Sequence, residues 1–246
     1  WNFPEDNLEF VRYHFLHSQR DVPERGAKTE AMMNRMRHAA KIFGVTEQSQ
    51  KLVEDLYLEY LDALNAHFES YPYLLGWGPC IGDFGLLAPM YAHLGRDPHP
   101  ARLMQQRAPA VYRWVERMNR EDQDAPEFFN AGSDFLADDE VPETLVEVLK
   151  ILAEDFVPET LAAADLINGW LGKHQPEGGS AAVGRLAEAL GTADFTVRSE
   201  RITALAQPHR FYLLQRVHDA FADFSQEKRD EVSALLEACD MAPILT

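Results

Sequence analysis

The amino-acid sequence predicts an all-α protein with at most one small β-hairpin. Apolar residues recur every three or four positions through almost every segment, which is the spacing of one face of an α-helix. Alternation of strands with helices, which a parallel sheet requires, is absent from the pattern. The 246 residues are 46% hydrophobic and 26% charged, an ordinary globular composition. A chain of this length and composition is able to bury a substantial core.

The charge balance and the cysteine content exclude several classes of function. Lys and Arg number 23 and Asp and Glu 40, so the formal net charge is 23 − 40 = −17. This excess repels nucleic-acid phosphates and anionic membrane surfaces, so neither partner is expected. Two cysteines, Cys80 and Cys239, are too few for a disulfide framework or a four-cysteine zinc site. The sequence contains no uninterrupted run of 18 apolar residues, so no transmembrane helix is predicted. We expect a soluble, cytoplasmic protein.

Two helices are predicted before residue 45. The first spans residues 4–19 and begins with Pro4, a residue suited to the first turn of a helix. Pro and Gly in residues 20–28 interrupt the helical pattern. The second helix spans residues 29–44 and ends at Gly44, because glycine adopts the left-handed conformation that follows many helices.

Two further helices flank a loop in the next segment. Thr46 is the N-cap of a long helix that extends to residue 68, with apolar residues at helical spacing. Residues 71–79 are rich in Gly, Pro and aromatic residues and are expected to form a loop. Residues 81–94 form the next predicted helix. It is apolar on nearly every side, which predicts a position in the middle of a bundle.

A polar segment then divides the chain. Residues 103–118 continue the helical pattern after a proline-rich break at residues 96–100. We expect a helical domain over residues 1–120, a linker over residues 121–140, and a helical extension over residues 141–246 that packs on the first part.

The extension contains a short repeat. The same five residues, Val-Pro-Glu-Thr-Leu, occupy residues 141–145 and 157–161. Two copies are too few for a solenoid, and we expect two helices that each carry Pro and Glu in the first turn.

The remaining extension predicts the hairpin and the closing helices. A short helix is expected to end at Gly191, and residues 195–204 contain two β-branched runs around a polar turn, which is the pattern of a small hairpin. Pro208 and Ser225 then open two closing helices.

The start of the helix over residues 81–94 carries a capping signal. Asp83, at the third helical position, is placed to accept a hydrogen bond from the backbone N–H of the N-cap residue, Cys80, and it faces the positive end of the helix. Pro79 and Phe84 occupy the positions of a hydrophobic staple. We therefore assign Cys80 and Asp83 a structural role as a helix cap.

This passage resembles the helical C-terminal domain of the glutathione transferases. In that family a leucine–glycine pair is followed, after two or three residues, by serine, isoleucine, alanine, aspartate and phenylalanine at the start of the central helix. A later helix of the family ends in a short sequence motif. Residues 114–118 of this chain, Trp-Val-Glu-Arg-Met, match that motif. The resemblance covers roughly residues 1–118, and residues 208–216 resemble the longer bacterial members more weakly. Cys80 replaces the family's Ser or Thr and is a weaker acceptor, a loss of about 1 kcal/mol.

The resemblance implies that glutathione and the acceptor substrate are bound by different domains. In the family, a preceding thioredoxin-like domain binds glutathione as co-substrate and supplies the residue that activates its thiol. None of that domain is in this sequence, so we expect the chain to start within a larger protein or to have been trimmed, and the catalytic residue is unknown. The helical part would bind a small hydrophobic electrophile, with Tyr13, His14 and His17 lining the acceptor cleft. The resemblance also implies that the protein can form a homodimer.

Alternative interpretations of the same residues remain. His14 and His17, with Asp21, form half of a divalent-metal site at helical spacing, but no third or fourth ligand follows at a telling distance, so no metal is expected. Cys80 lies at a helix N-terminus, which favours a thiolate, yet a nucleophile would also need a nearby histidine. The rival function is a non-catalytic helical binding or scaffold module.

Overall fold

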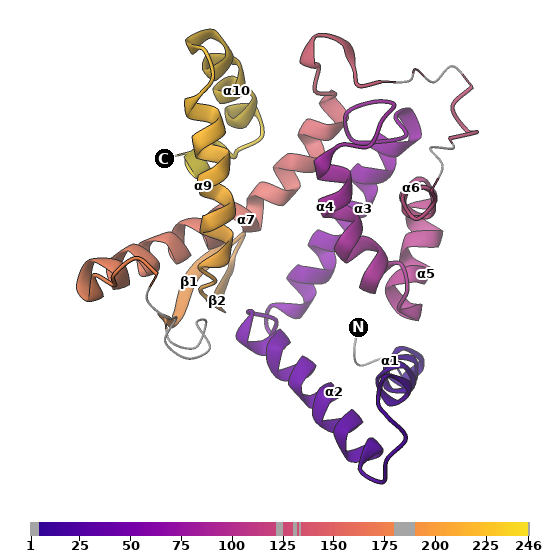
Figure 1. Cartoon of the computed structure of the whole chain (residues 1–246). Coiled ribbons are helices and arrows are strands. Elements are labelled where there is room, and N and C mark those ends of the chain that lie inside the picture. Colours follow the sequence, from indigo (N-terminus) through magenta and orange to yellow (C-terminus); the bar gives the residue numbers. More distant parts are fainter. Residues whose placement is uncertain (1–4, 122–124, 130–131, 133, 180–189, 246) are drawn as a thin grey trace. The chain divides into compact units, whose positions relative to one another are not determined.

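The computed structural model describes residues 5–121, 125–129, 132, 134–179 and 190–245 (Figure 1). Its contacts form two compact units. Unit 1 comprises Trp1–His38 and Leu56–Val148, and unit 2 comprises Ala39–Asp55 and Leu149–Thr246. In the described part of the chain the only sheet has two antiparallel strands, and helices make up most of the rest. The all-α prediction is confirmed.

The two units differ from the predicted domain boundaries. Residues 134–136, in the predicted linker, belong to unit 1 because they pair with the loop before residue 81: the backbone N–H of Trp77 donates to the carbonyl of Asp134, and that of Leu136 donates to the carbonyl of Leu75. Residues 39–55 belong to unit 2, where Gly44 has a φ of +86° and lies against Ile202. A Cβ at Gly44 would lie 2.5 Å from Cγ2 of Ile202, so a side chain does not fit there.

Beside a short 3-10 turn at Ala137–Asp139, the described residues of unit 1 contain six α-helices and one π-helical turn, wholly or mainly within the unit. They are α1 (Glu5–Ser18), α2 (Arg25–Ile42), α3 (Gln50–Ser70), α4 (Ile81–Pro89), a π-helical turn (Met90–Leu94), α5 (Pro98–Arg107) and α6 (Pro109–Met118). The core of the unit contains side chains from α3, α5 and α6: Leu61, Leu64, Phe68, Met104, Val111 and Trp114. The rings of Phe68 and Trp114 stack with centroids 4.9 Å apart, which fixes α6 against α3.

The predicted single helix over residues 103–118 is wrong, because α5 and α6 are separate helices. Ala108 lies between them with φ −134° and ψ 63°, outside the helical region. The following residue, Pro109, disfavours the helical conformation at Ala108 and lacks an N–H donor. Helix α5 also starts at Pro98, inside the segment that the sequence analysis assigned to a break.

The prediction that the helix after residue 81 lies in the middle of a bundle is also wrong. Asp83 is buried in α4 and Met90 in the π-helical turn, whereas Ile81 is 91% exposed and Phe84 59% exposed. Periodicity cannot show this, because an all-round apolar helix looks the same whether or not a neighbour covers each face. The change to a π-helical turn follows Pro89, which removes a backbone donor from the helix.

Unit 2 is built around the hairpin and the C-terminal half of α7. Strands β1 (Thr192–Val197) and β2 (Glu200–Leu205) pair antiparallel with Phe195 opposite Ile202, which confirms the predicted hairpin. Helices α9 (His209–Ala222) and α10 (Gln226–Ala238) are the two predicted closing helices. The short helix predicted to end at Gly191 falls mostly on residues 180–189, outside the described residues.

Helix α7 (Glu143–His174) is one helix where two were predicted. Pro158 lies inside it, although proline removes one helical hydrogen bond. The buried residues before and after Pro158 keep helical spacing and hold the helix together: Ala153, Val157, Thr160, Ala163 and Ile167. Ala163 and Ile167 form a small core with Ala193 of β1 and Ala206, against which Phe211 of α9 packs. This packing outweighs the lost hydrogen bond.

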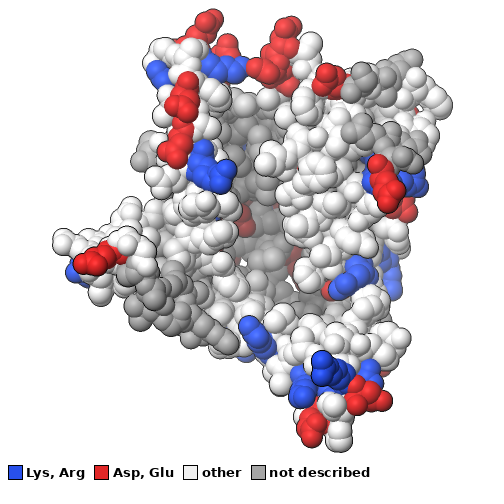
Figure 2. Space-filling model, viewed as in Figure 1, with Lys and Arg blue, Asp and Glu red and all other residues white. Residues whose placement is uncertain are grey.

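Among the described residues, neither a broad basic surface on the face viewed in Figure 2 nor a membrane-spanning helix is found. On the face in Figure 2, basic side chains lie among acidic ones, and the described residues form no continuous basic surface there. Within the described parts of the chain, every helix is too short or too polar to span a bilayer.

Candidate functional site

The carboxylate of Asp83 organises the loop that precedes α4. Asp83 has no exposed surface. Its Oδ2 accepts a hydrogen bond from the backbone N–H of Cys80 at 2.9 Å, and its Oδ1 accepts from the backbone N–H of Leu74 at 3.2 Å and from Nε1 of Trp114 at 2.9 Å. One carboxylate therefore ties together the helix start, the loop and α6.

The reciprocal bond of the capping box is made by sulfur. The Cys80 side chain accepts from the backbone N–H of Asp83, so the box is closed in both directions. Burial raises the pKa of the Cys80 thiol, and the neighbouring Asp83 carboxylate adds to the rise, although bonds from backbone N–H groups oppose it. The thiol is therefore protonated at neutral pH, which removes the argument for Cys80 as a nucleophile.

His67, on α3, is a buried polar residue that the sequence analysis did not single out. Its Nε2 lies 3.3 Å from the carbonyl oxygen of Tyr73, and its Nδ1 lies 2.9 Å from Oγ1 of Thr144. Burial lowers the pKa of His67, so the ring is neutral at pH 7. Because a carbonyl only accepts, Nε2 carries the proton and Nδ1 accepts from the Thr144 hydroxyl. His67 therefore fixes the other side of the loop.

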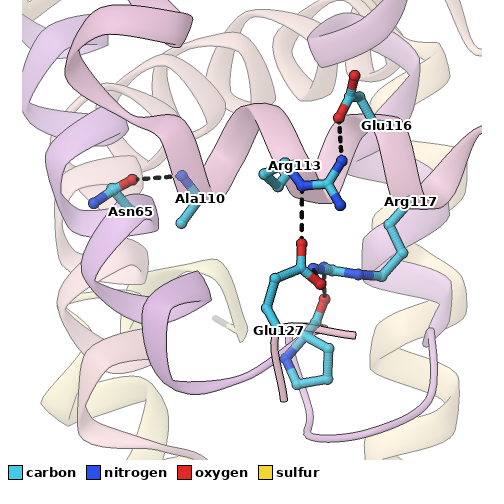
Figure 3. A network of polar contacts seen from close by, with 7 residues as sticks. Asn65, Ala110, Arg113, Glu116, Arg117 and Glu127 are labelled. Atoms are coloured by element: carbon cyan, nitrogen blue, oxygen red, sulfur yellow. Dashed lines mark hydrogen bonds and ion pairs between the residues drawn. The ribbon is translucent and has the colours of Figure 1, made fainter. Parts of the chain in front are cut away.

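Two arginines of α6 converge on one glutamate (Figure 3). The Glu127 carboxylate accepts from Nε of Arg113 at 2.9 Å and lies 3.6 Å from an Nη of Arg117. Arg117 also donates to the carbonyl of Pro72 at 2.8 Å, and its guanidinium lies 5.6 Å from the ring centre of Phe128. These contacts hold the segment after α6 against α6 itself and against the loop before α4.

The ionisation of this cluster follows from its burial and its contacts. Burial lowers the pKa of Arg117, whose side chain is only 4% exposed. For Glu127, burial acts to raise the pKa, but a backbone hydrogen bond and the two arginines outweigh it, so the pKa of Glu127 lies below its usual value. Glu127 is therefore ionised at neutral pH, and an arginine keeps its proton there even when burial lowers its pKa.

A cleft of about 200 Å³ opens beside the arginines. Its walls come from α3, α6 and the segment around residue 127: Phe68, Glu69, Ala110, Arg113, Arg117, Glu127 and Phe128. The start of α6 is held at its rim because Oδ1 of Asn65 accepts from the backbone N–H of Ala110 at 2.9 Å (Figure 3). The sequence carries no signal for this cleft, because the residues that line it are far apart in the chain.

The predicted acceptor residues lie together on α1. The ring centroid of Tyr13 is 4.0 Å from that of His17 and 5.6 Å from that of His14, and Tyr13 is 59% exposed. Nδ1 of His14 and Nδ1 of His17 each donate to the carbonyl four residues earlier, at 2.9 and 2.8 Å. They form an exposed aromatic face. A neighbouring cavity of about 10 Å³ is too small for a ligand and has other walls: Leu8, Val11, Phe15, Met33, Met36 and Arg37.

The described residues hold no group of three or more His, Cys, Asp and Glu side chains arranged to bind a metal ion. The pair His14 and His17 therefore has no further ligand within that part of the chain.

Comparison with known families finds one match. Residues 27–122 match the family model described as "Glutathione S-transferase, C-terminal domain". The match contains the Asp83 capping box and the end of α6. Among curated proteins and among solved structures, nothing matches the chain.

Proposed function

We propose that this chain is the acceptor-binding part of a glutathione transferase-like protein, because residues 27–122 match the model of the glutathione S-transferase C-terminal domain. In the intact protein a thioredoxin-like domain binds glutathione and lowers the pKa of its thiol. The thiolate sulfur then attacks the electrophilic carbon of a hydrophobic substrate, and the leaving group departs with the displaced electron pair. This chain contributes the surface that holds the substrate. The proposal includes a cytoplasmic location, where glutathione is abundant, and a homodimer.

The observation that carries the proposal is the family match together with the exposed apolar face of α4. Ile81 is 91% exposed and Phe84 59%, both directly beside the capping box. Large apolar side chains gathered on one surface suit a second domain or protein that covers them. We assign this face to the thioredoxin-like domain, which would bring glutathione to the N-terminal end of α4.

We assign the aromatic face of α1 to the acceptor. The rings of Tyr13 and His17 lie in contact, tilted by 31°, on the surface of α1, and an apolar aromatic electrophile would gain dispersion energy against them. The acceptor residues therefore act by binding and orientation. The proton and electron transfer at the sulfur would belong to the domain that holds glutathione.

Ligand-observed NMR tests this assignment. Saturation transfer from the chain to 1-chloro-2,4-dinitrobenzene is expected to fall by at least half in Tyr13→Ala and in His17→Ala. Tyr212→Ala is the matched control, because Tyr212 is 60% exposed on α9, about the same as Tyr13. An equal loss in all three variants, or no loss in Tyr13→Ala, contradicts the assignment.

The second candidate is a non-catalytic binding or scaffold module, which the exposed face of α4 favours equally. The two candidates differ in what precedes the helical domain in the gene. An upstream segment that encodes a thioredoxin-like domain favours the transferase, and a native start codon near Trp1 favours the scaffold.

A further inference from the structure

The guanidinium of Arg117 is a buried cation with incomplete partners. It makes one hydrogen bond, to the carbonyl of Pro72, and its contact with Glu127 at 3.6 Å is longer than a hydrogen bond. Its Nε is buried, and no acceptor among the described residues lies within hydrogen-bond distance of it. A buried donor without an acceptor is unfavourable by about 1–3 kcal/mol. The side chain therefore has unused capacity to bind an anion.

The position of Glu127 shows which anion the arrangement accepts. Its carboxylate already lies between Arg113 and Arg117 (Figure 3), and a guanidinium fork matches the two oxygens of a carboxylate. Glu127 comes from a short turn after α6, and its side chain is 35% exposed. Its partly exposed side chain is able to turn toward solvent when another carboxylate takes over its contacts with the two arginines.

The walls of the cleft define the rest of the ligand. Phe128, Phe68 and the methyl group of Ala110 supply apolar contact beside the two guanidinium groups. The volume of about 200 Å³ is below the roughly 300–1,000 Å³ of sites for drug-sized ligands, which limits the ligand to about one ring. We propose that this cleft binds a small aromatic carboxylate, whose carboxylate pairs with Arg113 and Arg117 in competition with Glu127 and whose ring lies against Phe128.

The charges of the cleft explain why Glu127 controls the affinity. Glu116 pairs with Arg113, and Glu69 lies in the wall, so with Glu127 present the acidic groups outnumber the two arginines. An anionic ligand gains a favourable field only when the Glu127 carboxylate leaves the guanidinium groups. The Glu127 carboxylate thus competes with the ligand carboxylate for the two guanidinium groups.

Fluorine NMR titration with 4-fluorobenzoate tests the proposal, with 4-fluorobenzamide as the uncharged probe of the same shape. We expect the benzoate to bind about ten-fold more tightly than the benzamide. Glu127→Gln is expected to tighten benzoate binding about ten-fold, and Arg113→Gln to weaken it by at least ten-fold. Ala110→Leu, which fills the cleft without changing charge, is expected to abolish binding of both probes.

An exposed ion pair of the same unit provides matched controls. Arg107 and Asp62 form a bidentate pair with bonds of 2.6 Å, and the Arg107 side chain is 44% exposed, close to the 41% of Arg113. Arg107→Gln and Asp62→Asn are expected to leave benzoate binding unchanged. The proposal is overturned by equal binding of the two probes, by unchanged affinity in Arg113→Gln, or by equal tightening in Asp62→Asn and Glu127→Gln. The site is independent of the conjugation chemistry, so its failure leaves the proposed function standing.

Discussion

Replacing Asp83 by alanine is expected to destabilise the protein far more than the loss of a helix cap. The carboxylate accepts three hydrogen bonds, from Cys80, Leu74 and Trp114, and it is completely buried. A cap alone is worth about 1 kcal/mol. Each hydrogen bond to an ionised group contributes about 1.5–3 kcal/mol to stability. Removing the buried charge also removes its desolvation cost, which offsets part of the loss. We therefore expect Asp83→Ala to lower the free energy of unfolding by about 3–5 kcal/mol.

Urea unfolding at pH 7, followed by circular dichroism and tryptophan fluorescence, measures this change. Asp83→Asn keeps one acceptor oxygen for Leu74 and Trp114 but turns an amide toward the N–H of Cys80, so an intermediate loss of about 1–3 kcal/mol is expected. Asp62→Ala is the control, because its ion pair is exposed and contributes little. A loss below about 1 kcal/mol in Asp83→Ala would refute the view that this carboxylate holds the loop to α6.

Three further substitutions test the fold. Pro158→Ala is expected to raise the stability by about 1–2 kcal/mol, since it restores a hydrogen bond inside α7, and a destabilised variant in thermal melts would contradict that reasoning. Cys80→Ser supplies a stronger acceptor to the N–H of Asp83 and should add about 0.5–1 kcal/mol; an unchanged melting temperature would show that sulfur caps as well as oxygen. Burial lowers the pKa of His67 below its ordinary 6.5, so the unfolded state binds the proton first and stability falls as the pH drops below about 6.5. Urea midpoints at pH 7.0 and 5.5 should therefore differ less for His67→Gln than for the natural sequence, and equal differences would refute the assignment.

Local signals in the sequence predicted local structure well. The hairpin follows from β-branched residues around Arg198–Glu200, and α10 begins at the predicted N-cap, where Oγ of Ser225 accepts from the N–H of Lys228 at 3.2 Å. The role of Asp83 as a cap likewise depends on a residue only three positions away. These features need no knowledge of the rest of the fold.

Features that depend on distant residues were missed. The bond from Arg117 to Pro72 spans 45 positions and that from His67 to Thr144 spans 77, so neither has a sequence signal beyond a polar residue on an apolar helix face. The continuity of α7 through Pro158 and the exposure of Ile81 depend on which surfaces pack together. Propensity describes single segments, and tertiary packing decides these cases.

Calorimetric titration of residues 1–246 with glutathione, beside a conjugation assay with 1-chloro-2,4-dinitrobenzene, tests the central claim most directly. The claim is that this chain holds the acceptor while another domain binds glutathione and activates its thiol. It predicts neither micromolar glutathione binding nor turnover above the uncatalysed rate. Micromolar binding or clear turnover by this chain would contradict it and would place the glutathione site within these helices.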